Sequence, residues 1–131
     1  IGHYLRYDVL NLQYFLKCQV KNIWDSKVCS KLVRTYSQNH GLKDLVFEFC
    51  EGKKLHKQYG SSDWNKSIDE MKDAMLQYAA GDVIYLHKIK DALHKMLVRE
   101  NRLELFESCM KFLPSRIKLD EKLFTEDIFA H

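Results

Sequence analysis

The chain has 131 residues, of which 46% are hydrophobic and 30% are charged, and its formal net charge is +3. That length is typical of one domain with its own core, and the apolar content excludes an intrinsically disordered chain. A small positive charge is compatible with an anionic partner but does not require one.

The four cysteines form no Cys-x-x-Cys pair and no His/Cys cluster. This pattern favours reduced thiols in a cytoplasmic protein over disulfides or a zinc site. No apolar run approaches the ~20 residues that a membrane-spanning helix needs. We therefore expect no membrane partner.

Apolar residues repeat at helical spacing along most of the chain, beginning with Leu5, Val9, Leu12 and Leu16. In chain order the pattern predicts a helix over about 5–17, a short strand over 22–24, a helix capped by residue 25 or 26 and running to about 36, and a helix over 42–50. Residues 51–66 have no periodicity and contain glycines and serines, which predicts a long loop.

The second half of the sequence is also helical in pattern. A capping box at residues 67–70 opens a helix that runs to about Arg99, with Val83, Leu86, Leu93 and Leu97 on its buried face. A last helix starts near residue 101, and Pro114 is expected to end it. An all-helical domain and an α/β domain without its first strands both fit this pattern.

The chain starts with isoleucine, and Ile1-Gly2 is typical of the end of a strand. We therefore expect residues 1–131 to be a single domain that is incomplete at its N-terminus. Such a domain would expose apolar surface and a sheet edge, so pairing into a homo-oligomer across that edge is expected.

Two short segments carry residues suited to catalysis. The segment Gly2–Asp8 (GHYLRYD) places a carboxylate one turn into a predicted helix, and Tyr78–Asp82 (YAAGD) places a phenol and a carboxylate one helical turn apart. Each is weak by itself. Asp8 also fits a solvated residue at a helix start, and Tyr78 also fits a core residue with Asp82 exposed.

Together, and in this order, the two segments resemble motifs of the DEDD exonucleases. The chain is similar to the subclass with tyrosine in its last motif, and within it to the ribonuclease D group in its compact bacterial form. The sister subclass has histidine five residues before the last aspartate, where this chain has Gln77. Further similar segments are Gly41–Leu45 (GLKDL), Ser61–Trp64 (SSDW), Glu100–Leu105 (ENRLEL) and Phe112–Pro114 (FLP).

The resemblance implies an α/β, RNase H-like fold, of which this chain is the helix-rich C-terminal portion. It also implies metal-dependent 3′–5′ exonuclease activity on the 3′ end of RNA or single-stranded DNA. Asp8 and Asp82 would bind Mg²⁺ or Mn²⁺ in a two-metal site, and Tyr78 would orient the attacking water.

The family's first motif, Asp-x-Glu, does not occur in these residues. Two of the four expected carboxylates are therefore not supplied, and we expect the chain by itself to be inactive. A non-catalytic nucleic-acid-binding or scaffold domain with the same fold is the alternative.

The loop predicted over residues 51–66 combines lysines with aromatic residues. Basic and aromatic side chains suit a single-stranded 3′ end, through phosphate contacts and base stacking. The alternative is a solvated loop with Trp64 in the core. The candidate nucleic-acid-binding residues are Lys53, Lys54, Lys57, Tyr59 and Trp64.

Overall fold

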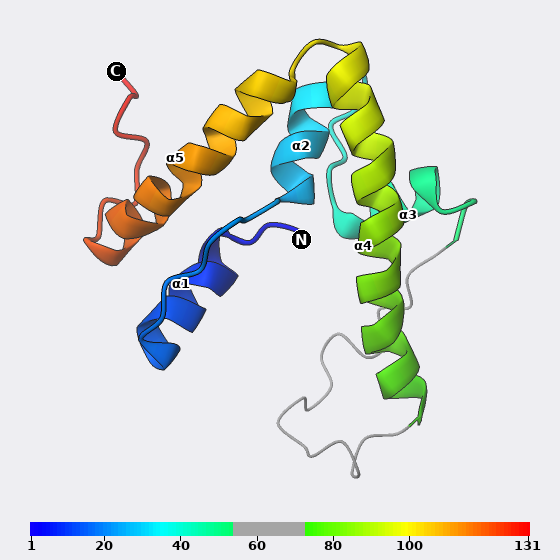
Figure 1. Cartoon of the computed structure of the whole chain (residues 1–131), viewed down its shortest axis with the longest axis horizontal. Helices are drawn as coiled ribbons and strands as arrows, with labels where there is room; N and C mark the ends of the chain where they lie inside the picture. The colour runs from blue at the N-terminus through cyan, green and yellow to red at the C-terminus, as the bar shows by residue number, and fades with distance from the viewer. Residues whose placement is uncertain (54–72) are drawn as a thin grey trace.

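The structure of the chain, a computed structural model, describes residues 1–53 and 73–131, and for residues 73–82 only the backbone. The described residues form α1 (Arg6–Leu16), α2 (Ser26–Val33), α3 (Leu42–Phe49), α4 (Asp73–Arg99) and α5 (Leu103–Glu121). In Figure 1, α4 and α5 are two long helices connected by a short turn. Helix α2 lies near that turn and packs against both helices. Helix α1 packs against α5, and α3 packs against α4.

The strand predicted over residues 22–24 is wrong. The described residues contain one isolated parallel bridge, between Gly2 and Asp25, and no extended strand. The Gly2 amide donates to the Trp24 carbonyl at 3.0 Å, and the Ser26 amide donates to the Gly2 carbonyl at 2.9 Å. A strand needs a partner along its length, and here the pairing stops after one residue. The part of the chain that is described is thus helical, and it shows no sheet.

The predicted helices over 5–17 and 42–50 are confirmed as α1 and α3, and the helix capped near residue 25 is confirmed as α2. Asp25 is the N-cap of α2, and its carboxylate accepts from the amides of Lys27 at 2.8 Å and Val28 at 3.2 Å. Helix α2 ends at Val33, three residues before the predicted end.

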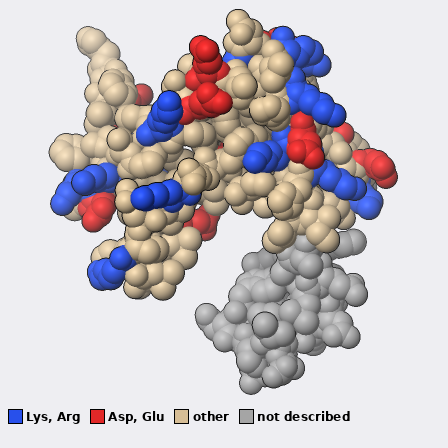
Figure 2. Space-filling model, in the orientation of Figure 1, with Lys and Arg blue, Asp and Glu red and all other residues tan. Residues whose placement is uncertain are grey.

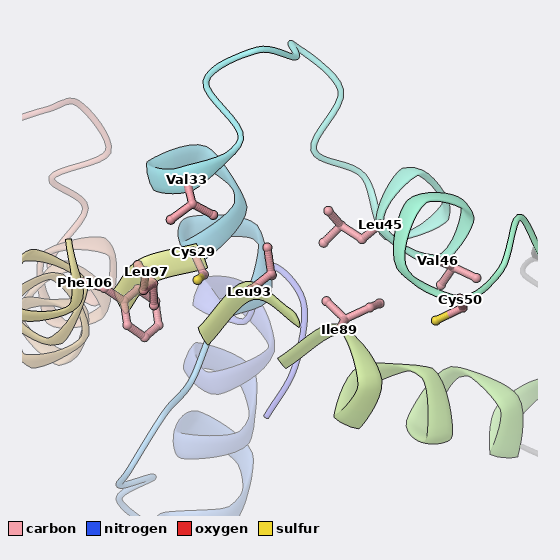
Figure 3. Packing of buried hydrophobic residues seen from close by; sticks show 9 residues of the cluster. All are labelled: Cys29, Val33, Leu45, Val46, Cys50, Ile89, Leu93, Leu97 and Phe106. Atoms are coloured by element: carbon pink, nitrogen blue, oxygen red, sulfur yellow. The ribbon is translucent and has the colours of Figure 1, made fainter. Parts of the chain in front are cut away.

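The main core forms where α2, α3 and α5 meet the C-terminal half of α4 (Figure 3). Ile89, Leu93 and Leu97 of α4 are fully buried and follow one another at helical spacing. Val83, which was predicted to lie on the same buried face, is 59% exposed. The other core residues are Cys29, Val33, Leu45, Val46, Cys50 and Phe106.

Pro114 does not end the last helix. It lies inside α5, which continues to Glu121. A proline in a helix interior removes one backbone hydrogen bond and costs about 3 kcal/mol. The burial of Leu113 and Ile117 on either side of Pro114, at 8% and 1% exposure, offsets that cost and keeps the helix continuous.

A second, smaller core joins α1 to α5. It contains Val9, Leu113 and Ile117, with Leu5 and Leu10 packed at its edge. No helix in the described parts of the chain is long and apolar enough to cross a membrane.

Candidate functional site

Asp8 lies in the first turn of α1 and is exposed to solvent. Residues four and seven positions apart share one face of a helix, so Asp8 shares its face with Leu12 and Phe15. These two side chains are 46% and 74% exposed. Val9 lies about 100° further around α1 and is buried against α5. The Asp8 carboxylate therefore stands on the uncovered face of α1, beside an apolar stripe.

The opposite side of α1 is held by an ion-pair cluster. Arg6 donates to both carboxylate oxygens of Asp120 on α5, at 2.6 and 2.5 Å, and Arg116 donates to one of them at 3.3 Å. The Asp120 side chain is 5% exposed. The hydrogen bond from Arg6 is the main reason that the pKa of Asp120 is lowered. The same contact raises the pKa of Arg6. We call these three residues the α1–α5 clamp.

Residues 78 and 82 lie in the N-terminal half of α4, one turn apart on a continuous helix. By helical register they fall on the same stripe as positions 85, 89 and 93. Ile89 and Leu93 on that stripe face the main core. The structure thus confirms the helix and the spacing of Tyr78 and Asp82, but their side chains lie outside the described residues, so their roles remain predictions.

Lys53 is the one predicted nucleic-acid-binding residue that lies within the described residues. It is exposed, and its ammonium lies 5.8 Å from the ring centroid of Tyr85, three residues after Asp82. A lysine and an aromatic ring therefore meet on the turn of α4 that follows the predicted metal ligand. The other four predictions, Lys54, Lys57, Tyr59 and Trp64, lie outside the described residues.

The charges on the face shown in Figure 2 do not mark a nucleic-acid surface among the described residues. In Figure 2, lysines and arginines on the visible face of the described residues alternate with aspartates and glutamates and do not gather in one patch.

The donor chemistry of the predicted metal residues fits a hard divalent cation, because carboxylate oxygens are the ligands that Mg²⁺ prefers. Asp8 is exposed, and its carboxylate makes no hydrogen bond or ion pair to the residues described around it. Its oxygens are accordingly accessible to a metal. The described residues contain no group of three or more histidines, cysteines, aspartates or glutamates close enough to form a complete metal site.

The cysteines are free thiols. Cys29 is fully buried in the main core, and burial raises its pKa to about 12. Cys50 is also buried, and its pKa is raised for the same reason. Both thiols are therefore protonated at neutral pH, and their role is packing in the core.

Two features of the region around Asp8 were not predicted from the sequence. One is the α1–α5 clamp, whose partners Arg6 and Asp120 are separated by most of the chain. The other is the left-handed backbone of Tyr4, at φ 60°. Neither has a local sequence signal, because tyrosine does not favour positive φ and distant ion pairs follow no spacing rule.

A family model described as 3′–5′ exonuclease matches residues 1–98, a range that includes Asp8, Tyr78 and Asp82. The chain belongs to the 3′–5′ exonuclease family. DNA polymerase I of Aquifex aeolicus is 32% identical over 101 residues, which are 74% of this chain and 16% of the polymerase. The members of this family are hydrolases that depend on divalent metal ions.

Solved nuclease structures are similar over nearly the whole chain. An apo form of a nuclease superimposes with a TM-score of 0.88 at 40% identity, covering 98% of this chain and 61% of that one. NrnC of Brucella melitensis gives a TM-score of 0.86 at 39% identity, covering 99% of this chain and 62% of that one. NrnC structures with bound Mg²⁺ and with bound pGG each give a TM-score of 0.85. The chain therefore spans less than two thirds of the structures it matches.

Proposed function

We propose that this chain is part of a ribonuclease D-like, cytoplasmic 3′–5′ exonuclease that removes nucleotides from the 3′ end of RNA or single-stranded DNA. The observation that supports this proposal is the family match over residues 1–98, which includes both motifs in the expected order. The α/β, RNase H-like fold is part of the proposal, as is a single domain over residues 1–131.

In this proposal Asp8 and Asp82 hold a divalent cation, Mg²⁺ or Mn²⁺. Bound metal ions supply the charge that activates water and stabilises the leaving oxygen in phosphodiester hydrolysis. Tyr78, one turn before Asp82 in the sequence, is proposed to orient the attacking water through a hydrogen bond of its hydroxyl group. The two-metal site needs four carboxylates, and Asp8 and Asp82 are two of them.

The proposed substrate is a single-stranded nucleic-acid end. A related nuclease, NrnC, has been solved with bound pGG, which supports a short nucleic acid as the ligand of this fold. Lys53 provides a cation beside the aromatic ring of Tyr85. Tyr85 follows Asp82 by three residues on α4. We propose that Lys53, with Lys54, Lys57, Tyr59 and Trp64, contacts phosphates and bases of the strand.

A non-catalytic nucleic-acid-binding or scaffold role is the second candidate. One observation favours it: the Asp-x-Glu pair does not occur in these residues. The exonuclease and the non-catalytic role differ in whether the nucleic acid is hydrolysed, and both predict that it is bound. Neither function specifies RNA or DNA as the ligand, because no residue here is assigned to contact a 2′-hydroxyl.

The test is Mn²⁺ titration and incubation with 3′-labelled single-stranded RNA and DNA. For the chain of 131 residues we expect weak Mn²⁺ binding that Asp8→Asn and Asp82→Asn each reduce further, and no shortening of either substrate. Robust shortening from the 3′ end would show that other groups replace the missing carboxylates. Mn²⁺ binding that neither variant changes would contradict the assigned ligands.

We also propose that copies of the chain associate. The proposed contact is pairing across the sheet edge that the sequence predicts, and the described residues show no sheet. Light scattering should show a dimer or a larger species, and a stable, cooperative monomer of the unmodified chain would contradict this.

A further inference from the structure

One buried carboxylate connects the start of α2 to the start of α1. Asp25 is 1% exposed. Beyond its role as N-cap of α2, Oδ1 of Asp25 accepts from the Tyr4 amide at 3.1 Å, and Oδ2 accepts from the Leu5 amide at 2.7 Å. The same side chain therefore accepts four backbone N–H groups, two from each helix start.

These contacts hold the chain in an unfavourable backbone conformation. Tyr4 has φ 60°, in the left-handed region that costs a non-glycine residue about 1–2 kcal/mol. This conformation turns the chain from the Gly2–Asp25 bridge into α1. Gly2 has no space for a side chain, because a Cβ there would lie 2.3 Å from Cδ2 of Leu5. The hydrogen bonds to Asp25 offset the cost of the turn.

Asp8 follows this turn directly. Leu5 is the N-cap of α1, and its carbonyl accepts from the Val9 amide at 2.8 Å, which is the first helical hydrogen bond. Asp8 is three residues after Leu5, and this corresponds to about 4.5 Å along the helix axis. The backbone of α1 sets where the Cα and Cβ of Asp8 lie, and therefore the region that its exposed carboxylate can reach. A rotation at Leu5 would move that carboxylate.

We propose that Asp25 is a positioning residue for the metal site: it orients Asp8 by fixing the first turn of α1 through the amides of Tyr4 and Leu5. This inference rests on the proposed role of Asp8 as a metal ligand. Outer groups that orient metal ligands typically change metal affinity by about 10–100-fold when they are replaced.

Asp25→Asn separates the two roles of this carboxylate. Asparagine is as good an N-cap as aspartate, so its remaining oxygen keeps the bonds to Lys27 and Val28. Its NH₂ group then replaces Oδ2 and faces the Leu5 N–H, donor against donor. The variant should loosen α1 and leave α2 intact. Asp25→Ser is a second variant, since a serine oxygen can cap α2 but is too short to reach Leu5 as well.

The first measurement is amide hydrogen exchange, which needs no metal. In Asp25→Asn, exchange at Leu5 and in the first turn of α1 should be at least about tenfold faster, while exchange in α2 is unchanged. Glu48→Gln is the matched control, because it also converts a carboxylate to an amide. Glu48 accepts from Arg34 at 3.0 Å and connects α3 to the end of α2, not to α1.

The second measurement is Mn²⁺ titration of the chain. The Mn²⁺ concentration at half-saturation should rise about tenfold in Asp25→Asn, and the full binding amplitude should return at high Mn²⁺. Partial unfolding would also raise the midpoint, because only the folded chain binds the metal. The far-ultraviolet circular dichroism of metal-free Asp25→Asn must therefore match that of the unmodified chain. Glu48→Gln should match the unmodified chain.

The inference is overturned if Asp25→Asn and Glu48→Gln affect α1 exchange equally. It is also overturned if Asp8→Asn weakens Mn²⁺ binding but Asp25→Asn does not. A different result identifies failure of the proposed function: Asp8→Asn binds Mn²⁺ like the unmodified chain, whatever Asp25→Asn does to the exchange of α1.

Discussion

The α1–α5 clamp gives a quantitative prediction for Asp120→Asn. The Asp120 side chain is 5% exposed and the Arg116 side chain 14% exposed, so neither charge has free access to water. Removing one partner of a buried pair costs about 3–5 kcal/mol. Arg6 is 26% exposed and recovers part of its hydration, and the amide keeps one acceptor oxygen. We therefore expect Asp120→Asn to lower the free energy of unfolding by about 2–3 kcal/mol.

The effect of pH on this variant has a definite sign. The pKa of Asp120 is lowered in the folded state, mainly by its hydrogen bond from Arg6. The folded state therefore binds this proton less readily than the unfolded state, whose aspartate pKa is ~3.9. The stabilisation is fully present above pH ~4 and is lost as pH falls through the lowered pKa. The difference between Asp120→Asn and the unmodified chain should shrink as the pH falls below ~4.

The assay is urea unfolding followed by far-ultraviolet circular dichroism at pH 7 and at lower pH. Glu100→Gln is the control, because the Arg99–Glu100 pair is exposed and should contribute less than about 1 kcal/mol. The reasoning would be refuted if Asp120→Asn matched Glu100→Gln at pH 7, or if the destabilisation grew as the pH fell.

Three further predictions concern the core, the proline and the thiols. Leu93→Ala, at a fully buried position of α4, should lower the free energy of unfolding by about 2–5 kcal/mol, and a loss below 1 kcal/mol in urea unfolding would contradict the described core. Pro114→Ala should raise the free energy of unfolding by about 1–2 kcal/mol, because it restores the missing backbone hydrogen bond of α5. A variant that unfolds at a lower temperature than the unmodified chain would count against this. A thiol reagent should label exposed Cys18 rapidly at neutral pH and Cys29, whose pKa is about 12, only on unfolding; equal rates for the folded chain would show that Cys29 is accessible.

Local sequence patterns determined the helices and the order of the motifs. Spacing of apolar residues predicted α1 and α3 and the continuation of α4 to Arg99, because helical hydrogen bonds join residues four apart. Asp25 or Ser26 was predicted to cap α2 from its type and its place before an apolar run, and Asp25 is the cap. The order of Asp8, Tyr78 and Asp82 indicated an exonuclease, and the family match confirms that family.

Only the tertiary structure decided which surfaces pack together. Val9 and Leu12 belong to one apolar stripe of α1, yet Val9 is buried and Leu12 is exposed, because α5 covers only part of that stripe. Pro114 ends a helix by local rules, but burial of its neighbours keeps α5 continuous. Asp25 reaches Leu5 because folding places the starts of α1 and α2 side by side. Such contacts depend on residues distant in sequence, and no local spacing encodes them.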